Sequence, residues 1–300
     1  MYSLNNISLE GMGFVAGKQQ DSNIALSGFL NMPARIGKTG HDWAEEPGIE
    51  AYVSAGDIFF GGRDLSLVGY IRGTDRYDTE EKRISINDTV DSFTDLVPLT
   101  SKWGTSNVYV NGAIVCDWLS ATTLRIVIPI REPIVPMTGI VPVGDGSEFG
   151  IDGISFKSLG GYQLELSGDR RNRPEPKAQD YTAYGREGHS ITKTIAPELT
   201  LRLYIKQPNY TAFKQKIDSI QALFGAPGYR SLTANNDKLR SFFVKDGFAM
   251  SMLYSKPDFF AGILTCKLTE SGVAGTFVDL IDSLGNLIMD TNGNQITVRI

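Results

Sequence analysis

Short stretches of the first half of this chain return in its second half in the same order, and this repetition limits the possible folds more than any other feature. The paired stretches share apolar, glycine and aromatic positions: Ile7–Gly13 with Ile154–Gly160, Leu26–Gly28 with Leu166–Gly168, His41–Trp43 with Gln179–Tyr181, Leu67–Arg72 with Leu201–Lys206, and Asn111–Gly112 with Asp246–Gly247. The offset between partners drifts gradually, as expected when loops differ in length. The shared order predicts two tandem copies of one domain.

The length and composition of the chain agree with this division. The chain has 300 residues, of which 41% are hydrophobic, so each half can bury a core of its own. A stretch rich in proline and then glycine separates the copies, and such a stretch stiffens the chain before letting it turn. The predicted parts are a first domain over 1–130, a linker over 131–150, a second domain over 151–270 and a C-terminal extension over 271–300.

Most apolar residues within each copy alternate with polar residues, as in a strand with one buried face. This period of two covers residues 65–70 in the first copy and 199–205 in the second. Residues 124–128 and 262–268 are expected to form a closing strand in each copy.

One dipeptide in each copy predicts a tight β-hairpin. Asn111-Gly112 and Asp246-Gly247 lie between apolar stretches, and both dipeptides tolerate the positive φ that a two-residue hairpin turn requires. We therefore expect the strands on either side of each dipeptide to pair.

One helix is predicted in each copy. Asn209 can cap a helix over 210–224 that Gly225 ends, and a poorer helical pattern covers about 79–93. The residues expected on the buried faces are Phe213, Ile217, Ile220, Leu223 and Phe224 in the second copy, and Ile86, Val90 and Phe93 in the first. Together, these patterns predict a mainly β fold with one helix per domain, as two tandem small β-barrels or sandwiches.

The last thirty residues lie outside the repeat and are predicted to form a C-terminal β-hairpin extension. Asp282–Ile288 returns as Asp290–Ile296, with Gly-Asn turns in both stretches. The carboxylate spacing does not fit a calcium-binding loop. Because an isolated hairpin is marginal in water, we expect this one to contact a neighbouring protein.

No motif for catalysis, metal binding or a cofactor is intact. Residues 37–39, Gly-Lys-Thr, resemble the end of a phosphate-binding loop, but that loop needs a glycine where this chain has Met32. His41 and His189 have no metal-ligand spacing to cysteine or carboxylate residues. We therefore expect a protein that is not an enzyme and binds no cofactor.

The cysteines and the hydropathy pattern lead to two further expectations. Cys116 and Cys266 are far apart in the sequence and are expected to be reduced. No run of 18 apolar residues is present, and the N-terminus lacks the basic-then-apolar pattern of a secretory leader. A membrane span and secretion are therefore not expected.

Charge is divided unevenly between the halves of the chain. The first 150 residues hold 11 Lys and Arg against 19 Asp and Glu, a net charge of −8, and the rest hold 18 against 15, a net charge of +3. Arg170, Arg171, Arg173 and Lys177 form the one basic cluster, in a proline-containing loop. This loop is a solvated surface, a contact for an acidic surface of the first domain in the same chain or the next, or a nucleic-acid contact. Neither half is basic enough to make nucleic-acid binding its main task.

A succession of features in the second copy resembles a known family. These features are the stretch 180–188 with its Gly-Arg-x-Gly turn, the strand 201–205, the helix 210–224, the stretch 240–243 and the closing strand 262–268. In this order they resemble the N-terminal ring domain of the distal tail proteins of long-tailed bacteriophages. The resemblance extends only loosely to the first copy, where Gly61-Gly62-Arg63 is not at the matching place.

This resemblance implies a split β-barrel that packs side by side with copies of itself into a ring. Such rings join the tail tube to the host-adsorption apparatus, and related tail hubs double the domain, so either a hexamer or a trimer is implied. The implied protein is a structural component of the virion tail, assembled in the host cytoplasm. Its partners would be the tail tube protein and other tail-tip or baseplate proteins, with DNA only as passing cargo.

A second function, from another class, stays open. A carbohydrate-binding module built of two β-sandwiches would need exposed aromatic residues on one face. Trp43, Trp103 and Trp118 are the candidates, and all three lie in the first copy.

Overall fold

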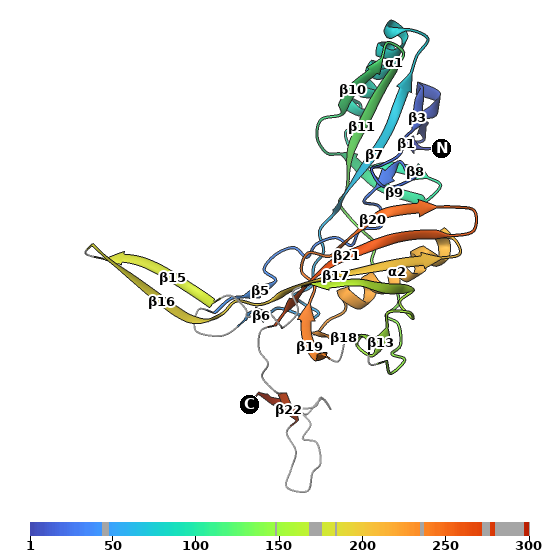
Figure 1. The fold of residues 1–300 in the computed structure, drawn as a ribbon. Coiled ribbons are helices and arrows are strands. Elements are labelled where there is room, and N and C mark those ends of the chain that lie inside the picture. The colour runs from blue at the N-terminus through green and yellow to red at the C-terminus, as the bar shows by residue number, and fades with distance from the viewer. Residues whose placement is uncertain are drawn as a thin grey trace.

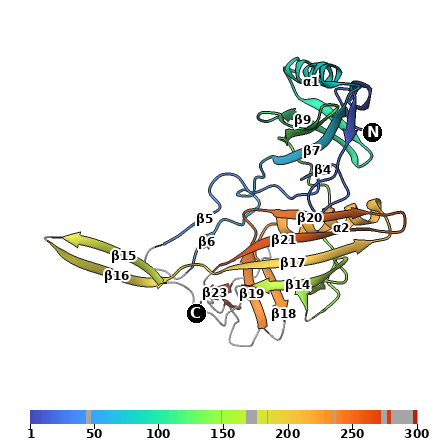
Figure 2. The same ribbon diagram turned by 45° about the horizontal axis from the view of Figure 1, so that its top comes forward.

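Two curved β-sheets, each with one helix, lie one above the other, and a long two-stranded hairpin projects beside the second sheet (Figures 1 and 2). The computed structural model describes the chain except for residues 44–47, 148, 168–175, 184, 235–236, 272–276, 280–296 and 300, and in parts of several strands it describes the backbone alone. The predicted fold class, mainly β with two helices, is confirmed for the described residues.

The first sheet has nine strands. They are β1 (Ser3–Leu4), β2 (Ile7–Ser8), β3 (Phe14–Ala16), β4 (Leu26–Ser27), β7 (Arg63–Arg72), β8 (Val97–Ser101), β9 (Gly104–Val110), β10 (Val115–Ser120) and β11 (Thr123–Glu132). Their order is β2-β1-β8-β9-β11-β7-β3, with β10 also paired to β11 and β4 also paired to β7. A short 3-10 helix, η1 (Glu10–Met12), connects β2 to β3.

The second sheet has eight strands in a matching order. They are β12 (Gly150–Ile151), β13 (Ile154–Ser155), β14 (Gly161–Ser167), β17 (Glu198–Gln207), β18 (Arg230–Ala234), β19 (Asp237–Phe243), β20 (Phe248–Ser255) and β21 (Phe260–Glu270). Their order is β13-β12-β18-β19-β21-β17-β14, with β20 also paired to β21. Each strand of this path has its counterpart in the first sheet, as expected if one domain was duplicated.

The repeated leucines hold equivalent places in the two sheets. Leu26 on β4 pairs with Leu67 on β7, and Leu166 on β14 pairs with Leu201 on β17. The one difference lies just before them, because β14 runs through as a single strand where the first sheet has β3 and β4. Residues 17–25 separate these two strands, and this loop makes the first copy seven residues longer here.

The predicted helix of the second copy is confirmed as α2 (Tyr210–Gly225). The side chain of Asn209 caps it by accepting a hydrogen bond from the backbone N–H of Ala212 at 2.9 Å. All five residues predicted for its apolar face are buried, and Phe213 packs against Phe260 of β21 with ring centroids 4.7 Å apart. The apolar face therefore anchors α2 on the second sheet.

The helix of the first copy, α1 (Arg76–Asp91), begins three residues before the predicted start. The reason is a cap that the sequence prediction missed: Asp75 accepts a hydrogen bond from the backbone N–H of Asp78 at 2.9 Å. Ile86 and Val90 are buried as predicted.

The tight hairpins predicted at Asn111-Gly112 and Asp246-Gly247 are wrong. β9 and β10 do not pair with each other but pair in succession with β11, and β19 and β20 do the same with β21. The glycines adopt positive φ, 118° at Gly112 and 65° at Gly247, but the positive φ kinks a strand path instead of reversing it. Both dipeptides were correctly expected to contain a residue with positive φ. The chain does not reverse there because β11 and β21 are each long enough to pair with two strands in succession.

Three small two-stranded sheets complete the described elements. They are β5 (Gly40–His41) with β6 (Glu50–Ala51), β15 (Pro176–Ala183) with β16 (Arg186–Thr194), and β22 (Phe277–Asp279) with β23 (Thr297–Arg299). The pair β15–β16 is the long hairpin that projects away from both sheets in Figure 1. The Gly-Asn turns predicted for the C-terminal extension fall between β22 and β23, outside the described residues.

The core of the second sheet follows the predicted alternation on β17, whereas on β7 of the first sheet Val68 is buried together with Leu65 and Leu67. On β17 the side chains of Leu199, Leu201, Leu203 and Ile205 are all fully buried. Burial of each such side chain contributes about 1.5–3 kcal/mol relative to exposure, which makes this strand a main support of the second domain. Neither helix among the described residues is long and apolar enough to cross a membrane.

Candidate functional site: the contact between the two domains

The residues predicted to form a basic interface cannot be placed as side chains. Arg170, Arg171 and Arg173 lie outside the described residues, and Lys177 is on β15, where the backbone alone is described. Lys177 therefore belongs to a strand and not to the predicted loop, and the predicted interface itself stays a prediction. The surfaces that the structure does describe are those between the two domains and along the outer strand edges.

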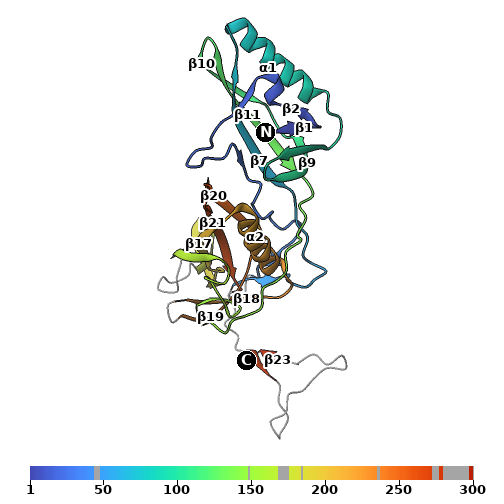
Figure 3. The same ribbon diagram turned by 90° about the vertical axis from the view of Figure 1, so that its right-hand side faces the viewer.

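A segment of the first domain covers the outer edge of β20 in the second domain. We name residues 22–35 the docking segment. Its backbone N–H groups at Met32 and Arg35 donate to the carbonyl oxygens of Phe248 at 3.0 Å and Lys245 at 2.7 Å. In Figures 1 and 3, β20 is the strand of the second sheet that lies nearest to the first domain.

Side chains of the docking segment complete the cover. Asn31 accepts a hydrogen bond from the backbone N–H of Met250 at 2.8 Å, and the hydroxyl of Ser22 donates to the carbonyl oxygen of Leu253 at 2.7 Å. Each such bond contributes about 0.5–1.5 kcal/mol, and together they satisfy an edge that would otherwise be open to pairing. These bonds fix the register of the docking segment on β20, because they use backbone groups of Phe248, Met250 and Leu253 that all face away from β21.

An aromatic cluster joins the domains at a second point. Trp103 lies at the tip of the β8–β9 hairpin. The centroid of its ring is 5.0 Å from that of Tyr210, 5.4 Å from that of Phe260 and 6.1 Å from that of Phe29. The hydroxyl of Tyr210 donates a hydrogen bond to the backbone carbonyl oxygen of Trp103 at 2.7 Å. Burial raises the pKa of Tyr210 to about 12, with a further contribution from Asp218, so the hydroxyl remains a donor well above neutral pH.

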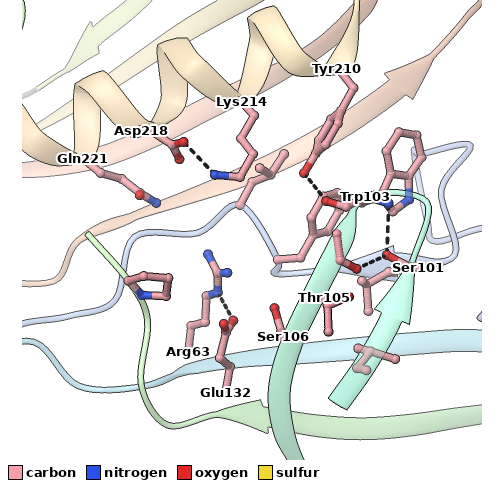
Figure 4. Close-up of a pocket in the computed structure, with 16 residues that line it drawn as sticks. Arg63, Ser101, Trp103, Thr105, Ser106, Glu132, Tyr210, Lys214, Asp218 and Gln221 are labelled. Carbon is pink, nitrogen blue, oxygen red and sulfur yellow. Dashed lines mark hydrogen bonds and ion pairs between the residues drawn. The ribbon is translucent and has the colours of Figure 1, made fainter. Parts of the chain in front are cut away.

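A small pocket of about 120 Å³ lies beside this cluster, between the first sheet and α2 (Figure 4). On one wall, Arg63 Nε and Glu132 Oε2 form an ion pair at 2.7 Å, with side chains only 12% and 4% exposed. On the other wall, Lys214 and Asp218 of α2 form a second pair at 2.6 Å. The pocket is large enough for a few water molecules, and its polar walls suit them.

The Arg63–Glu132 pair has no copy in the second domain. The strand register aligns Glu132 with Glu270, which is also buried, but aligns Arg63 with Pro197. Arg63 also donates from Nη1 to the carbonyl oxygen of Asn31 at 3.2 Å. The arginine therefore ties the first sheet to the docking segment, a task that belongs to the first copy alone.

The three tryptophans do not form the shared face that a carbohydrate-binding module would need. Trp103 is buried, with 8% exposure, in the interdomain cluster. Trp43 follows β5 and donates to Glu50 at 2.7 Å, whereas Trp118 is on β10 of the first sheet, beside Arg76 of α1. Glycan-array binding that is lost in a Trp43→Ala variant would favour that function.

The other candidate chemical groups are scattered. Lys38 Nζ lies 3.1 Å from Nδ1 of His41 at an exposed place at the start of β5, while His189 is on β16, where its side chain is not described. Among the described residues, no group of three histidine, cysteine or acidic side chains could hold a metal ion.

Both cysteines are free thiols, as predicted. Cys266 is fully buried on β21 and Cys116 is half-buried on β10. Burial raises the pKa of each thiol, which keeps both in the protonated, less reactive form at neutral pH.

The docking segment is the functional feature that the sequence analysis missed. It has no alternating pattern, because its contacts join backbone and short polar side chains to a distant strand. One signal could have indicated it, namely the seven extra residues that precede Leu26 in the first copy.

No family model and no curated protein sequence matches this chain.

Proposed function

We propose that this chain is a structural protein of a bacteriophage tail tip or baseplate, and that copies of it form a ring joining the tail tube to the host-adsorption apparatus. The role is structural, not catalytic. Its partners in the proposal are other copies of itself, the tail tube protein and further tail-tip proteins, with DNA passing through the ring as cargo. The location is the virion tail, after assembly in the host cytoplasm.

The observation that carries the proposal is the way the two domains meet. They share one strand order, yet they touch through different faces: the first domain offers the docking segment and Trp103, and the second offers β20 and the start of α2. Contacts between two different faces of like units continue from unit to unit, and they close into a ring when the rotation permits.

The β15–β16 hairpin gives the proposal further support. A two-stranded hairpin outside a larger sheet is marginal in water, because it buries little apolar surface on its own. This hairpin projects beyond the rest of the fold (Figure 2), so a neighbouring subunit or tail protein is the natural source of its missing contacts.

The proposal is tested by the mass and shape of the purified full-length chain. Light scattering should give the mass of three or six chains, and electron microscopy of the same sample should show rings with a central opening. A particle of three chains would identify a hub and one of six a distal tail protein. A chain that stays monomeric at every concentration and salt condition would contradict the proposed function.

A further inference from the structure

The second domain receives the first through two elements, the outer edge of β20 and the start of α2. On β20, the backbone carbonyl oxygen of Leu253, whose side chain is only 3% exposed, accepts from Ser22, and the outward N–H of Met250 is bonded to Asn31. At the start of α2, Tyr210 is bonded to Trp103. These two elements together form a receiving face.

The first domain has the same two elements. Cys116 of β10 pairs with Ile126 of β11 as Met250 pairs with Leu264 of β21, and both edge strands end in a register shift. This register places Leu119 of β10 at the position of Leu253. The start of α1 corresponds in the same way to the start of α2, and its Arg76 lies over the ring of Trp118 at 5.3 Å.

The receiving face of the first domain is uncovered. Leu119 is 59% exposed where Leu253 is buried, whereas Val115 and Trp118, at 51% and 40%, are exposed like their counterparts Ala249 and Met252. Among the described residues, no backbone hydrogen bond joins the outer edge of β10 to another segment. In Figure 1, β10 lies at the outer side of the first sheet with no further strand beside it.

The surroundings of Gly247 and Gly112 differ in the same way as the two receiving faces. A Cβ atom added to Gly247 would lie 2.2 Å from the carbonyl oxygen of Met32, because the docking segment runs directly over this turn. At Gly112, the equivalent position, the nearest atom would be Cγ of Pro129 at 3.7 Å, within the same domain. Space that the docking segment fills in the second domain is therefore open in the first.

We infer that the β10 edge, with Leu119, Trp118 and Arg76, is the surface on which a second copy of this chain docks through its second domain. The inference rests on the proposed ring and names the contact that would close it. The contact inside the chain is its template: the first domain docks on the second, and the second domain of one chain docks on the first domain of the next. The receiving face of the second domain is covered within the chain, and the receiving face of the first domain can bind a neighbouring chain.

The physical properties of the edge fit this occupant. An open strand edge flanked by exposed apolar side chains is a template for pairing with another chain, and monomeric proteins usually block it with charges or proline. Val115, Trp118 and Leu119 provide no such block, and the exposed carboxylate of Asp117 on the same strand is paired with Arg125 at 3.1 Å. The two halves also carry opposite net charge, −8 and +3, which favours contact of a second half with a first half over contact between two first halves.

Two variants of the full-length chain test the inference. Leu119→Lys places a charge in the contact, and Cys116→Pro removes the outward N–H of an edge strand, where proline is tolerated. We expect each to weaken self-association by about tenfold or more in sedimentation and light scattering, because central interface residues often contribute this much. The melting temperature should stay near that of the wild type.

Two controls accompany these variants. Ile140→Lys changes an apolar residue that is 83% exposed in the linker, and it should assemble normally. Leu253→Lys changes the residue of β20 that corresponds to Leu119. Because Leu253 is buried, this change should lower the melting temperature of the chain.

A photo-crosslinker at position 119 identifies the occupant. In a mixture of light and isotope-labelled chains, crosslinks between chains should reach residues of the second domain. Crosslinks to β10 of another chain, or normal assembly of both β10 variants, would overturn the inference while leaving the ring in place. A wild-type chain that never assembles would overturn the proposed function and this inference together.

Discussion

The side-chain amide of Asn23 bonds both backbone groups of Ser255, a residue of the other domain. Asn23 Oδ1 accepts from the N–H of Ser255 at 2.8 Å, and Asn23 Nδ2 donates to its carbonyl oxygen at 2.7 Å. One amide thus takes the place of a neighbouring strand at the end of β20. The bond pattern explains how a segment that forms no strand beside β20 can close this sheet edge.

Asn23→Ala should destabilise the chain by about 1–3 kcal/mol, because it leaves two part-buried backbone groups of Ser255 without partners. Asn23→Asp is the matched variant, since a carboxylate still accepts from the N–H but cannot donate to the carbonyl oxygen. Urea unfolding should place Asn23→Asp between the wild type and Asn23→Ala. Equal stability of all three proteins would show that water replaces the amide without loss.

Trp103→Ala should uncouple the two domains. Removing a buried tryptophan from the contact with Phe29, Tyr210 and Phe260 should lower stability by about 3–5 kcal/mol. In calorimetry we expect the melting of the two domains to separate into two transitions. Trp118→Ala is the control, because this tryptophan is 40% exposed and its removal should change the stability of the monomer little.

The buried pair of Arg63 and Glu132 should behave as a unit. Glu132→Gln should cost about 3–5 kcal/mol, because it leaves the arginine charge buried without its partner. The double variant Arg63→Met with Glu132→Leu should recover most of this loss, since no buried charge remains. A double variant less stable than Glu132→Gln would contradict this account and show that the arginine bond to Asn31 matters more.

Asp145 should make the second domain sensitive to acid. Its carboxylate accepts hydrogen bonds from the hydroxyls of Ser155 and Ser158, both at 2.6 Å, and these bonds lower its pKa to about 2. A lowered pKa gives stability that is present above the unfolded value near 4 and is lost as the pH falls towards 2. Asp145→Asn should therefore lower the melting temperature at pH 7 and hardly change it at pH 2. A constant difference across this range would mean that charge plays no part.

The basic loop remains a prediction from sequence, and it has its own test. Replacing Arg170, Arg171 and Arg173 by glutamate should slow ring formation at low salt, because the loop would then repel the acidic first domain. Exposed ion pairs contribute only about 0–1 kcal/mol each and are screened by salt, so melting temperatures should stay unchanged. Assembly at the normal rate at low salt would show that the charge asymmetry is surface drift.

The parts of the fold that could be predicted are those with a local cause. The alternation over β17 and the cap at Asn209 are properties of neighbouring residues, and both were found in the sequence. The start of α1 was missed because Asp75 precedes a helix with few apolar residues, which hid the cap. Local patterns therefore identified the elements but placed a weak helix inaccurately.

The parts that could not be predicted depend on distant residues. An Asn-Gly or Asp-Gly dipeptide provides positive φ, but only the lengths of β11 and β21 decide whether the chain then reverses or continues along the same edge. The docking segment depends in the same way on β20, more than 200 residues later. Its hydrogen bonds join backbone groups and short polar side chains such as Asn23 and Asn31, which form no periodic sequence pattern.

The distance along the chain between the docking segment and β20 has a consequence for synthesis on the ribosome. Ser22 and Leu253 are 231 residues apart, so at typical rates the nascent docking segment waits about 10–50 s for its partner strand to be made. Until then the docking segment, and Trp103 once it has been made, remain without the surface that covers them. Translation pauses late in the message would prolong this exposure, and chaperones that hold nascent chains would act on the first domain before its last contacts exist.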